Sequence, residues 1–224
     1  MNWLRARVGP RGRRFLDWYD LYVADHGYIR AFWPNIHKVS DQVWRSGQPS
    51  PQRVRWWAET HGIRTIVNLR GPSDSGYYRL EEEACKRYGI TLVNLTTQAR
   101  KPPKPHLLSD ARRVFAEAEY PILMHCKSGA DRAGFMSVYY QLVVEGRAYE
   151  EAITQLGHKY GHVRTADTGI LDFFWERFRD ARASDGLAFD DWAAERYDRD
   201  ELASAHKTNA WSNLLVNKIL RREG

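Results

Sequence analysis

The chain has 224 residues and a formal net charge of +6, with 43% hydrophobic and 28% charged residues. This length and composition suit one domain with additions and exclude a mostly disordered chain, while two cysteines are too few for a disulfide scaffold. No run approaches the roughly 18 apolar residues of a membrane-spanning helix, and no apolar segment follows the basic N-terminus, so we expect a cytoplasmic protein without a secretory signal.

Short strands are predicted in the middle of the chain. Val43–Gly47 is the first, and it ends in a turn-rich run of Gly, Pro and Ser. Ile63–Leu69, Ile90–Leu95 and Pro121–His125 follow, each rich in apolar residues. Such runs are typical of strands that are buried on both faces of a sheet.

Helices alternate with these strands. Ser50 is a good N-cap residue and Pro51 suits the first helical position, so Pro51–His61 is predicted to be a helix. The later predicted helices are Arg79–Tyr88, His106–Glu119, Phe135–Glu145, Tyr149–Leu156 and Gly169–Arg179. This alternation predicts an α/β fold in which helices flank a central, mostly parallel sheet.

The two ends of the chain differ from this middle part. Residues 1–38 and 181–224 are predicted to be aromatic-rich helical additions to a domain that spans residues 39–180. Both ends are basic, and the second has an apolar helical face formed by Trp211, Leu214, Leu215, Ile219 and Leu220. These ends are either solvated helices packed on the domain or contacts with the anionic inner face of a membrane; we expect no nucleic-acid partner.

Residues 125–134 (HCKSGADRAG) carry the residue types of a catalytic site. They lie between a predicted buried strand and a helix, where a short loop turns backbone N–H groups inward and forms a concave anion site. Cys126, at the start of the loop, is expected to be a thiolate among these donors. Arg132 brings a planar fork that matches two phosphate oxygens, and Gly129 permits a backbone conformation that a side chain would obstruct.

This His-Cys-x5-Arg loop resembles the phosphate-binding loop of the cysteine-dependent phosphatases, the protein tyrosine and dual-specificity superfamily. Residues 44–51 (WRSGQPSP) and 62–70 (GIRTIVNLR) look like the opening of the small bacterial enzymes of the dual-specificity type. The plant and fungal atypical dual-specificity phosphatases open in a similar way. The resemblance covers roughly residues 39–180 and implies a dual-specificity phosphatase-like fold that hydrolyses phosphomonoesters without a metal or another cofactor.

The resemblance also implies a role for each residue of the loop. The Cys126 thiolate attacks phosphorus and forms a phosphocysteine, which water then hydrolyses. Arg132 and the loop amides stabilise the phosphate oxygens as charge develops, and His125 supports the loop. The phosphate-binding residues are then Lys127, Ser128, Gly129 and Ala130.

Two features depart from the family pattern. Most relatives take their general acid from an aspartate upstream of the cysteine, but the matching residues 94–100 (NLTTQAR) contain no carboxylate. Asp131 is the better candidate, because the Cys-x4-Asp-Arg pattern resembles the loops of myotubularin and Sac-type phosphoinositide phosphatases; alternatively it fixes Arg132 or caps the helix. Ala133 replaces the usual serine or threonine, which implies slow hydrolysis of the phosphocysteine.

The sequence is compatible with three functions. A phosphatase of protein phosphotyrosine, and of phosphoserine as well, comes first by family. A phosphatase of membrane lipid, glycolipid or inositol phosphates comes second, because Lys127, the basic ends and a basic rim at Arg100, Lys101 and Lys104 favour substrates with extra negative charge. A weakly active or inactive phosphate-binding module comes third, because of Ala133.

Other candidate residues have weaker support in the sequence. His158 and His162 lack a third ligand and stand beside glycines that argue against a helix, so no metal site is predicted. Their polar segment is expected to hold a structural Arg164–Asp167 pair. Cys85 is expected to lie on a helix face, although the resemblance also allows a protective disulfide with the loop cysteine.

Overall fold

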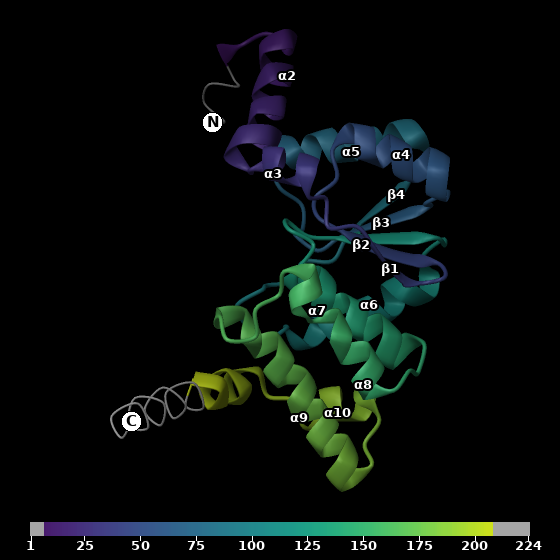
Figure 1. Ribbon diagram of the computed structural model, residues 1–224, viewed down its shortest axis with the longest axis vertical. Helices are drawn as coiled ribbons and strands as arrows, with labels where there is room; N and C mark the ends of the chain where they lie inside the picture. Colours follow the sequence, from purple (N-terminus) through teal and green to yellow (C-terminus); the bar gives the residue numbers. More distant parts are fainter. Residues whose placement is uncertain (1–6, 208–224) are drawn as a thin grey trace.

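Residues 7–207 are described in the computed structural model, and the predictions made for residues 1–6 and 208–224 lie outside them. A five-stranded sheet has the strand order β1-β2-β5-β3-β4. β1 (His37–Ser40) is antiparallel to β2 (Val43–Ser46); β2, β5 (Ile122–His125), β3 (Thr65–Asn68) and β4 (Thr91–Asn94) are parallel to their neighbours. The predicted fold, a mostly parallel sheet flanked by helices, is confirmed (Figure 1).

Each predicted strand is present with its ends shifted by at most two residues. β1 was not predicted, because its four residues carry a single apolar side chain, Val39, and no strand pattern can be recognised in so short a run. It pairs with β2 in a hairpin and begins at His37, just before the predicted domain boundary at residue 39. That boundary stays a prediction.

Two helices, α4 (Pro51–His61) and α5 (Gly76–Tyr88), cover one face of the sheet (Figure 1). The side chain of Ser50 accepts a hydrogen bond from the Arg53 backbone N–H at 3.4 Å, so the predicted N-cap of α4 is confirmed. The buried residues between these helices and the sheet include Val54, Trp57, Ile66, Cys85 and Leu123.

The other face of the sheet carries a larger helical layer (Figure 1). Its elements are α6 (Pro105–Glu117), α7 (Asp131–Tyr139), a π-helical turn (Tyr140–Val144), α8 (Tyr149–Ala152), α9 (Ile170–Asp185) and α10 (Phe189–Glu195). The predicted helix at Phe135 begins four residues earlier, directly after the loop, and the one at Tyr149 is shorter and continues as a 3-10 turn, Ile153–Gln155. Buried aromatic residues fill this layer: Phe135, Tyr139, Phe174, Trp175, Phe189 and Trp192.

The predicted helical additions are confirmed within the described residues. α2 (Pro10–Tyr19), a π-helical turn (Asp20–Ala24) and α3 (Gly27–Phe32) lie outside α5, against which α2 packs (Figure 1). At the other end, α10 and the helical residues 199–207 follow α9. Within the described part of the chain, no helix has the length and apolar character needed to cross a membrane.

The strand order brings three loops together. β5 lies between β2 and β3, and its last residue, His125, is in register with Ser46 of β2 and Asn68 of β3. Because these strands are parallel, the segments that follow them leave the sheet at the same edge, which is where open α/β sheets bind ligands. The predicted catalytic loop is one of these segments.

Candidate active site

The phosphate loop, residues 126–132, joins the end of β5 to the first turn of α7. Cys126 is buried at its start, and its Sγ accepts a hydrogen bond from the Gly129 backbone N–H at 3.2 Å. Gly129 has a φ of +79°, and a Cβ there would lie 2.7 Å from the backbone N of Gly47. Only glycine therefore fits this position, as its place in the loop predicted.

Arg45, a buried arginine of β2, holds the loop from behind. Its guanidinium donates hydrogen bonds to the carbonyl oxygens of Gly129 at 2.7 Å and Ala130 at 2.8 Å, and to that of Gln155 at 2.6 Å. Because the C=O and N–H of a peptide unit point in opposite directions, carbonyls turned towards Arg45 leave the next N–H groups facing the opposite side. Burial lowers the pKa of Arg45 to about 10, and the negative charge of Cys126 counteracts this effect.

His125 and Glu81 form a buried pair beneath the loop. Nε2 of His125 lies 2.7 Å from Oε1 of Glu81 on α5, and both side chains are fully buried. The other carboxylate oxygen of Glu81 accepts a hydrogen bond from the Gln48 side chain at 2.8 Å, and Nδ1 of His125 lies 3.4 Å from the Cys126 carbonyl oxygen. These contacts fix the orientation of the imidazole, which suits the supporting role predicted for His125.

Arg132 and Asp131 have different surroundings. Arg132 is half-buried, and its side chain has no hydrogen bond or ion pair with another residue in the range 7–207, so its guanidinium is available to an anion. Asp131 lies with Oδ1 2.8 Å from Nδ1 of His162, and Nε2 of His162 lies 2.7 Å from Oδ2 of Asp172 on α9. We call Asp131, His162 and Asp172 the acidic flank of the loop.

The imidazole of His162 is buried between two carboxylates. Burial alone would lower its pKa, but hydrogen bonds to Asp131 and Asp172 and their charges outweigh that effect and raise the pKa to about 9. His162 is therefore an imidazolium at neutral pH. Sequence reasoning missed this role, because His162 lies in a segment of short 3-10 turns with no recognisable period.

A second group of residues, in contact with the loop at Lys127, is rich in cations. Asp25, from the N-terminal addition, accepts hydrogen bonds from Arg30 at 2.7 Å and from Arg70 at 2.7 and 2.8 Å, and it lies 3.5 Å from Nζ of Lys127. We call Asp25, Arg30, Arg70 and Lys127 the cationic flank. Asp25 and both arginines are more than 90% buried, whereas the Lys127 side chain is 44% exposed.

The carboxylate of Asp25 is stabilised in its ionised form by these cations. Burial alone would raise its pKa, but the hydrogen bond and charge of Arg70, with the charges of Arg30 and Lys127, hold the pKa below its ordinary value. Sequence reasoning named Lys127 but missed Asp25 and Arg30, since the resemblance did not cover the N-terminal addition. Asn35, also from that addition, donates a hydrogen bond to the Ser128 carbonyl oxygen at 2.9 Å and further ties the addition to the loop.

Several weaker candidates lie elsewhere. Arg100 and Lys101, two of the three residues of the predicted basic rim, line a pocket of about 490 Å³ together with residues of the C-terminal helix. Asp110 forms an ion pair with Arg113 on its own helix. Among the described residues no group of side chains could hold a metal ion; His158 is exposed, whereas His162 is buried and contacts Asp131 and Asp172.

One expectation is wrong, and another, that Cys85 lies on a helix face, agrees with its position in α5. The predicted Arg164–Asp167 pair is wrong: Arg164 forms its ion pair with Glu176, because α9 brings that carboxylate over the segment. Cys85 is buried among the residues between the sheet and α4 and α5, whereas Cys126 belongs to the cluster on the other face. Both thiols are free, and they belong to different core clusters.

The comparisons with known proteins agree with this geometry. A family model described as "DSP-PTPase phosphatase fused to NAD+ Kinase" matches residues 34–170, more than half of the chain. Dual specificity protein phosphatase TpbA of Pseudomonas aeruginosa is 27% identical over 167 residues, which cover 70% of this chain and 73% of the relative. The TpbA crystal structure shares the fold, with a TM-score of 0.52 and 24% identity over 68% of this chain and 92% of that one.

Two eukaryotic proteins are also similar. Inositol diphosphatase DSP3 of Arabidopsis thaliana is 32% identical over 114 residues, which cover 49% of this chain and 55% of the relative. The core catalytic domain of the PP-IP phosphatase SIW14 from S. cerevisiae matches with a TM-score of 0.52 and 20% identity, over 68% of this chain and 94% of that one. The chain therefore belongs to the DSP-PTPase family and is a phosphatase of the cysteine-dependent type.

Proposed function

We propose that Cys126 is the nucleophile of this phosphatase. Its thiolate attacks phosphorus, the bond to the leaving oxygen breaks, and a phosphocysteine forms that water then hydrolyses to inorganic phosphate and free Cys126. The Gly129 N–H at 3.2 Å from Sγ is the observation that carries this assignment, since it places the sulfur within the concave loop. The unpaired Arg132 then stabilises the equatorial phosphate oxygens as charge develops.

Turnover of p-nitrophenyl phosphate by the wild type beside Cys126→Ser tests this assignment. We expect the substitution to abolish turnover, and we expect a burst of nitrophenol in the wild type because Ala133 supplies no hydroxyl to help the thiolate leave. Equal turnover by both proteins would exclude Cys126 as the nucleophile. Phosphate binding without turnover in the wild type would instead support the third function, a phosphate-binding module.

Asp131 is the group that we propose to protonate the leaving oxygen. Residues 94–100 offer no carboxylate, Asp25 is held by three cations and Asp110 by Arg113, so none of these competes with Asp131. The proton comes from the imidazolium of His162 and passes through the Asp131 carboxylate, across their 2.8 Å contact, to the leaving oxygen. During hydrolysis the attacking water gives its proton back to this pair.

The substrate is a phosphomonoester, and the cationic flank favours one that carries further negative charge. Arg30, Arg70 and Lys127 bring three positive charges against the single carboxylate of Asp25, so an excess of positive charge borders the loop. The relative named as an inositol diphosphatase is in line with such a substrate. A phosphotyrosine or phosphoserine protein, the first expectation by family, is the less charged alternative, and the relative TpbA is named as a dual specificity protein phosphatase.

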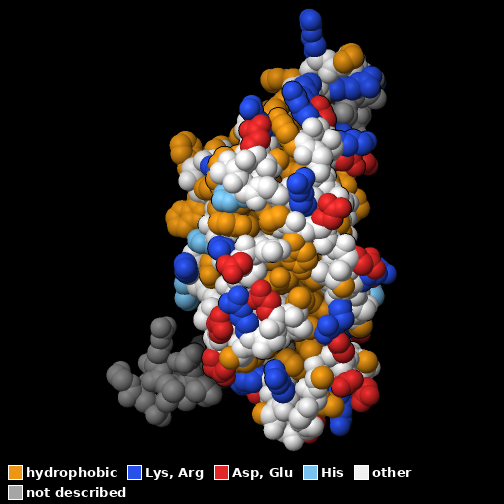
Figure 2. Space-filling model, turned by 90° about the vertical axis from the view of Figure 1, so that its right-hand side faces the viewer, with side chains coloured by type: hydrophobic (Ala, Val, Ile, Leu, Met, Phe, Trp, Pro, Cys, Tyr) orange, Lys and Arg blue, Asp and Glu red, His pale blue; other side chains and the backbone are white. Residues whose placement is uncertain are grey.

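A membrane lipid phosphate is a second candidate because of the N-terminal addition. Large hydrophobic side chains are exposed along residues 15–33: Phe15, Tyr19, Val23, Tyr28, Ile29, Phe32 and Trp33. Phe32 is 92% and Trp33 is 65% exposed. Figure 2 shows basic side chains gathered at this end of the molecule beside hydrophobic ones. Aromatic rings beside arginines are typical of surfaces that bind the headgroup region of anionic bilayers.

Flotation with vesicles of phosphatidylglycerol and phosphatidylcholine tests this second candidate. Phe32→Ser with Trp33→Ser is expected to release most of the protein from the vesicles, while Val163→Ser, at an exposed hydrophobic residue elsewhere, leaves binding unchanged. Binding that survives loss of the two aromatic residues and of residues 1–14 would exclude this surface. The enzyme would then act on a substrate in solution.

A further inference from the structure

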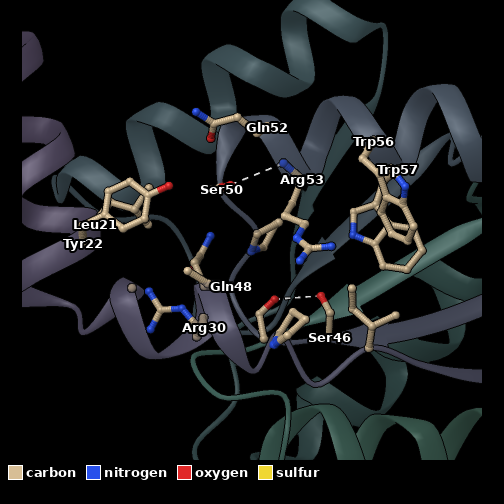
Figure 3. Close-up of a pocket in the computed structure, with 16 residues that line it drawn as sticks. Leu21, Tyr22, Arg30, Ser46, Gln48, Ser50, Gln52, Arg53, Trp56 and Trp57 are labelled. Carbon is tan, nitrogen blue, oxygen red and sulfur yellow. Dashed lines mark hydrogen bonds between the residues drawn. The ribbon is translucent and has the colours of Figure 1, made fainter.

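A pocket separate from the phosphate loop lies between the N-terminal addition and the start of α4 (Figure 3). Its volume of about 380 Å³ is within the range of small-molecule sites. None of residues 126–132 lines it. Residues 46–48 stand between the pocket and the loop, where the Gln48 backbone N–H donates a hydrogen bond to the Lys127 carbonyl oxygen at 3.2 Å.

Two guanidinium groups give this pocket its charge. Arg53 extends into the cavity (Figure 3), and its side chain has no hydrogen bond or ion pair with any residue that the structure describes. Arg30 lines the same cavity; two of its nitrogens contact Asp25, but its Nε is buried without a partner. No carboxylate occurs among the described residues that line the pocket, so unfilled cationic donors border it.

The walls of the pocket suit a flat ring. Trp56 is half-buried, and the Arg53 guanidinium lies 5.7 Å from the centre of its ring, so a ligand ring can stack on this pair. Tyr22 lines the opposite side in Figure 3. Ser50, the N-cap of α4, also lines the cavity, so the positive end of this 11-residue helix adds to the field of the two arginines.

We infer that this pocket is a second binding site, distinct from the catalytic loop, for a small organic anion with a phosphate, phosphonate or carboxylate group on a flat ring. The anionic group takes the free donors of Arg53 and Arg30, and the ring lies against Trp56. The site is connected to the loop through Arg30, because Arg30 pairs with Asp25 and Asp25 lies beside Lys127. It is independent of the choice of substrate and of the acid proposed above.

Ligand-induced shifts of the thermal midpoint test this inference, with phenylphosphonate as the probe. The full chain carries Arg132→Met in every sample, so that the catalytic loop is disabled at a residue without protein partners. Phenylphosphonate is expected to raise the midpoint in this background, and adding Arg53→Met is expected to weaken its apparent affinity at least tenfold. Arg55→Met is the matched control, because Arg55 lies on the same helix but pairs with Glu59 on the exposed face.

The experiment tests three points separately: that a second site exists, that Arg53 belongs to it, and that it needs both the ring and the anion of the ligand. No shift in the Arg132→Met background would mean that the loop is the only site and would overturn the inference. Equal losses with Arg53→Met and Arg55→Met would overturn it as well. Methylphosphonate and benzyl alcohol test the two halves of the ligand: a methylphosphonate shift as large as that of phenylphosphonate would remove the ring from the proposal, and an equal benzyl alcohol shift would remove the anion.

Discussion

The two flanks of the phosphate loop have opposite charge patterns. On the cationic flank three positive side chains surround one carboxylate, Asp25, whereas on the acidic flank two carboxylates surround one imidazole, His162. The first pattern leaves an excess of positive charge, which attracts an anion. The second stabilises a bound proton. The difference supports the proposal that substrate attraction and proton storage belong to separate groups of residues around the phosphate loop.

The removal of the Asp25 carboxylate is expected to have the largest effect among the substitutions that test this difference between the flanks. Asp25→Ala leaves Arg30 and Arg70 buried without their counter-charge, so the free energy of unfolding is expected to fall by about 4 kcal/mol. Asp41→Ala is the control, since its exposed pair with Lys38 should contribute little to the free energy of unfolding. Urea unfolding measures both values. A loss for Asp25→Ala no larger than that for Asp41→Ala would show that the cationic flank does not depend on this carboxylate.

The acidic flank predicts a specific dependence of stability on pH. The folded pKa of His162 is about 9, above its ordinary value of 6.5, so the stabilisation is fully present below pH 6.5 and is lost as the pH rises through 9. The loss across this window is expected to approach roughly 3 kcal/mol in the wild type. His162→Gln should flatten the profile, while His158→Gln, at an exposed histidine, should leave it as in the wild type. Parallel profiles for His162→Gln and the wild type would contradict the assignment.

Asp131→Asn distinguishes a proton donor from a structural anchor. An acid is needed most when the leaving group is poor, so turnover of an alkyl phosphate is expected to fall about a hundredfold, and turnover of p-nitrophenyl phosphate by much less. The ratio of the two rates is the measurement. Equal losses on both substrates would leave Asp131 with the anchoring role that its contact with His162 also permits.

Lys127→Met is expected to have the smallest effect, a change in KM, and it tests whether the cationic flank attracts substrates with extra phosphates. The KM for inositol hexakisphosphate is expected to rise roughly tenfold, since the exposed ammonium attracts the extra phosphates, while the KM for p-nitrophenyl phosphate changes about twofold. Lys38→Met serves as the control, because Lys38 pairs with Asp41 away from the loop. Equal changes for both substrates would assign Lys127 to the scissile phosphate alone.

The predicted parts of the site are those that lie close together in the chain. Residues 125–134 form one continuous segment between a strand and a helix, so their residue types and spacing, together with the family resemblance, were enough to predict their chemistry. The residues that contact this segment could not be predicted from the sequence, because they lie far away in the chain. His162 lies 31 positions after Asp131, and Asn35 lies 93 positions before Ser128. Such contacts depend on how helices and turns pack. The wrong Arg164–Asp167 pair has the same origin, since the true partner lies on α9.

The contribution of Asp25 and Arg30 from a separate helical addition has a consequence for how this enzyme can change. The family match begins at residue 34 and ends at residue 170, so Asp25, Arg30 and Asp172 all lie outside it. Under the proposed mechanism, substitutions in these outer segments would change the preferred phosphate ester or the pH dependence while Cys126 stays unchanged. Conversely, a fragment cut to the family boundaries would keep Cys126 and Arg132 but lose Asp25 and Arg30 from the cationic flank and Asp172 from the acidic flank.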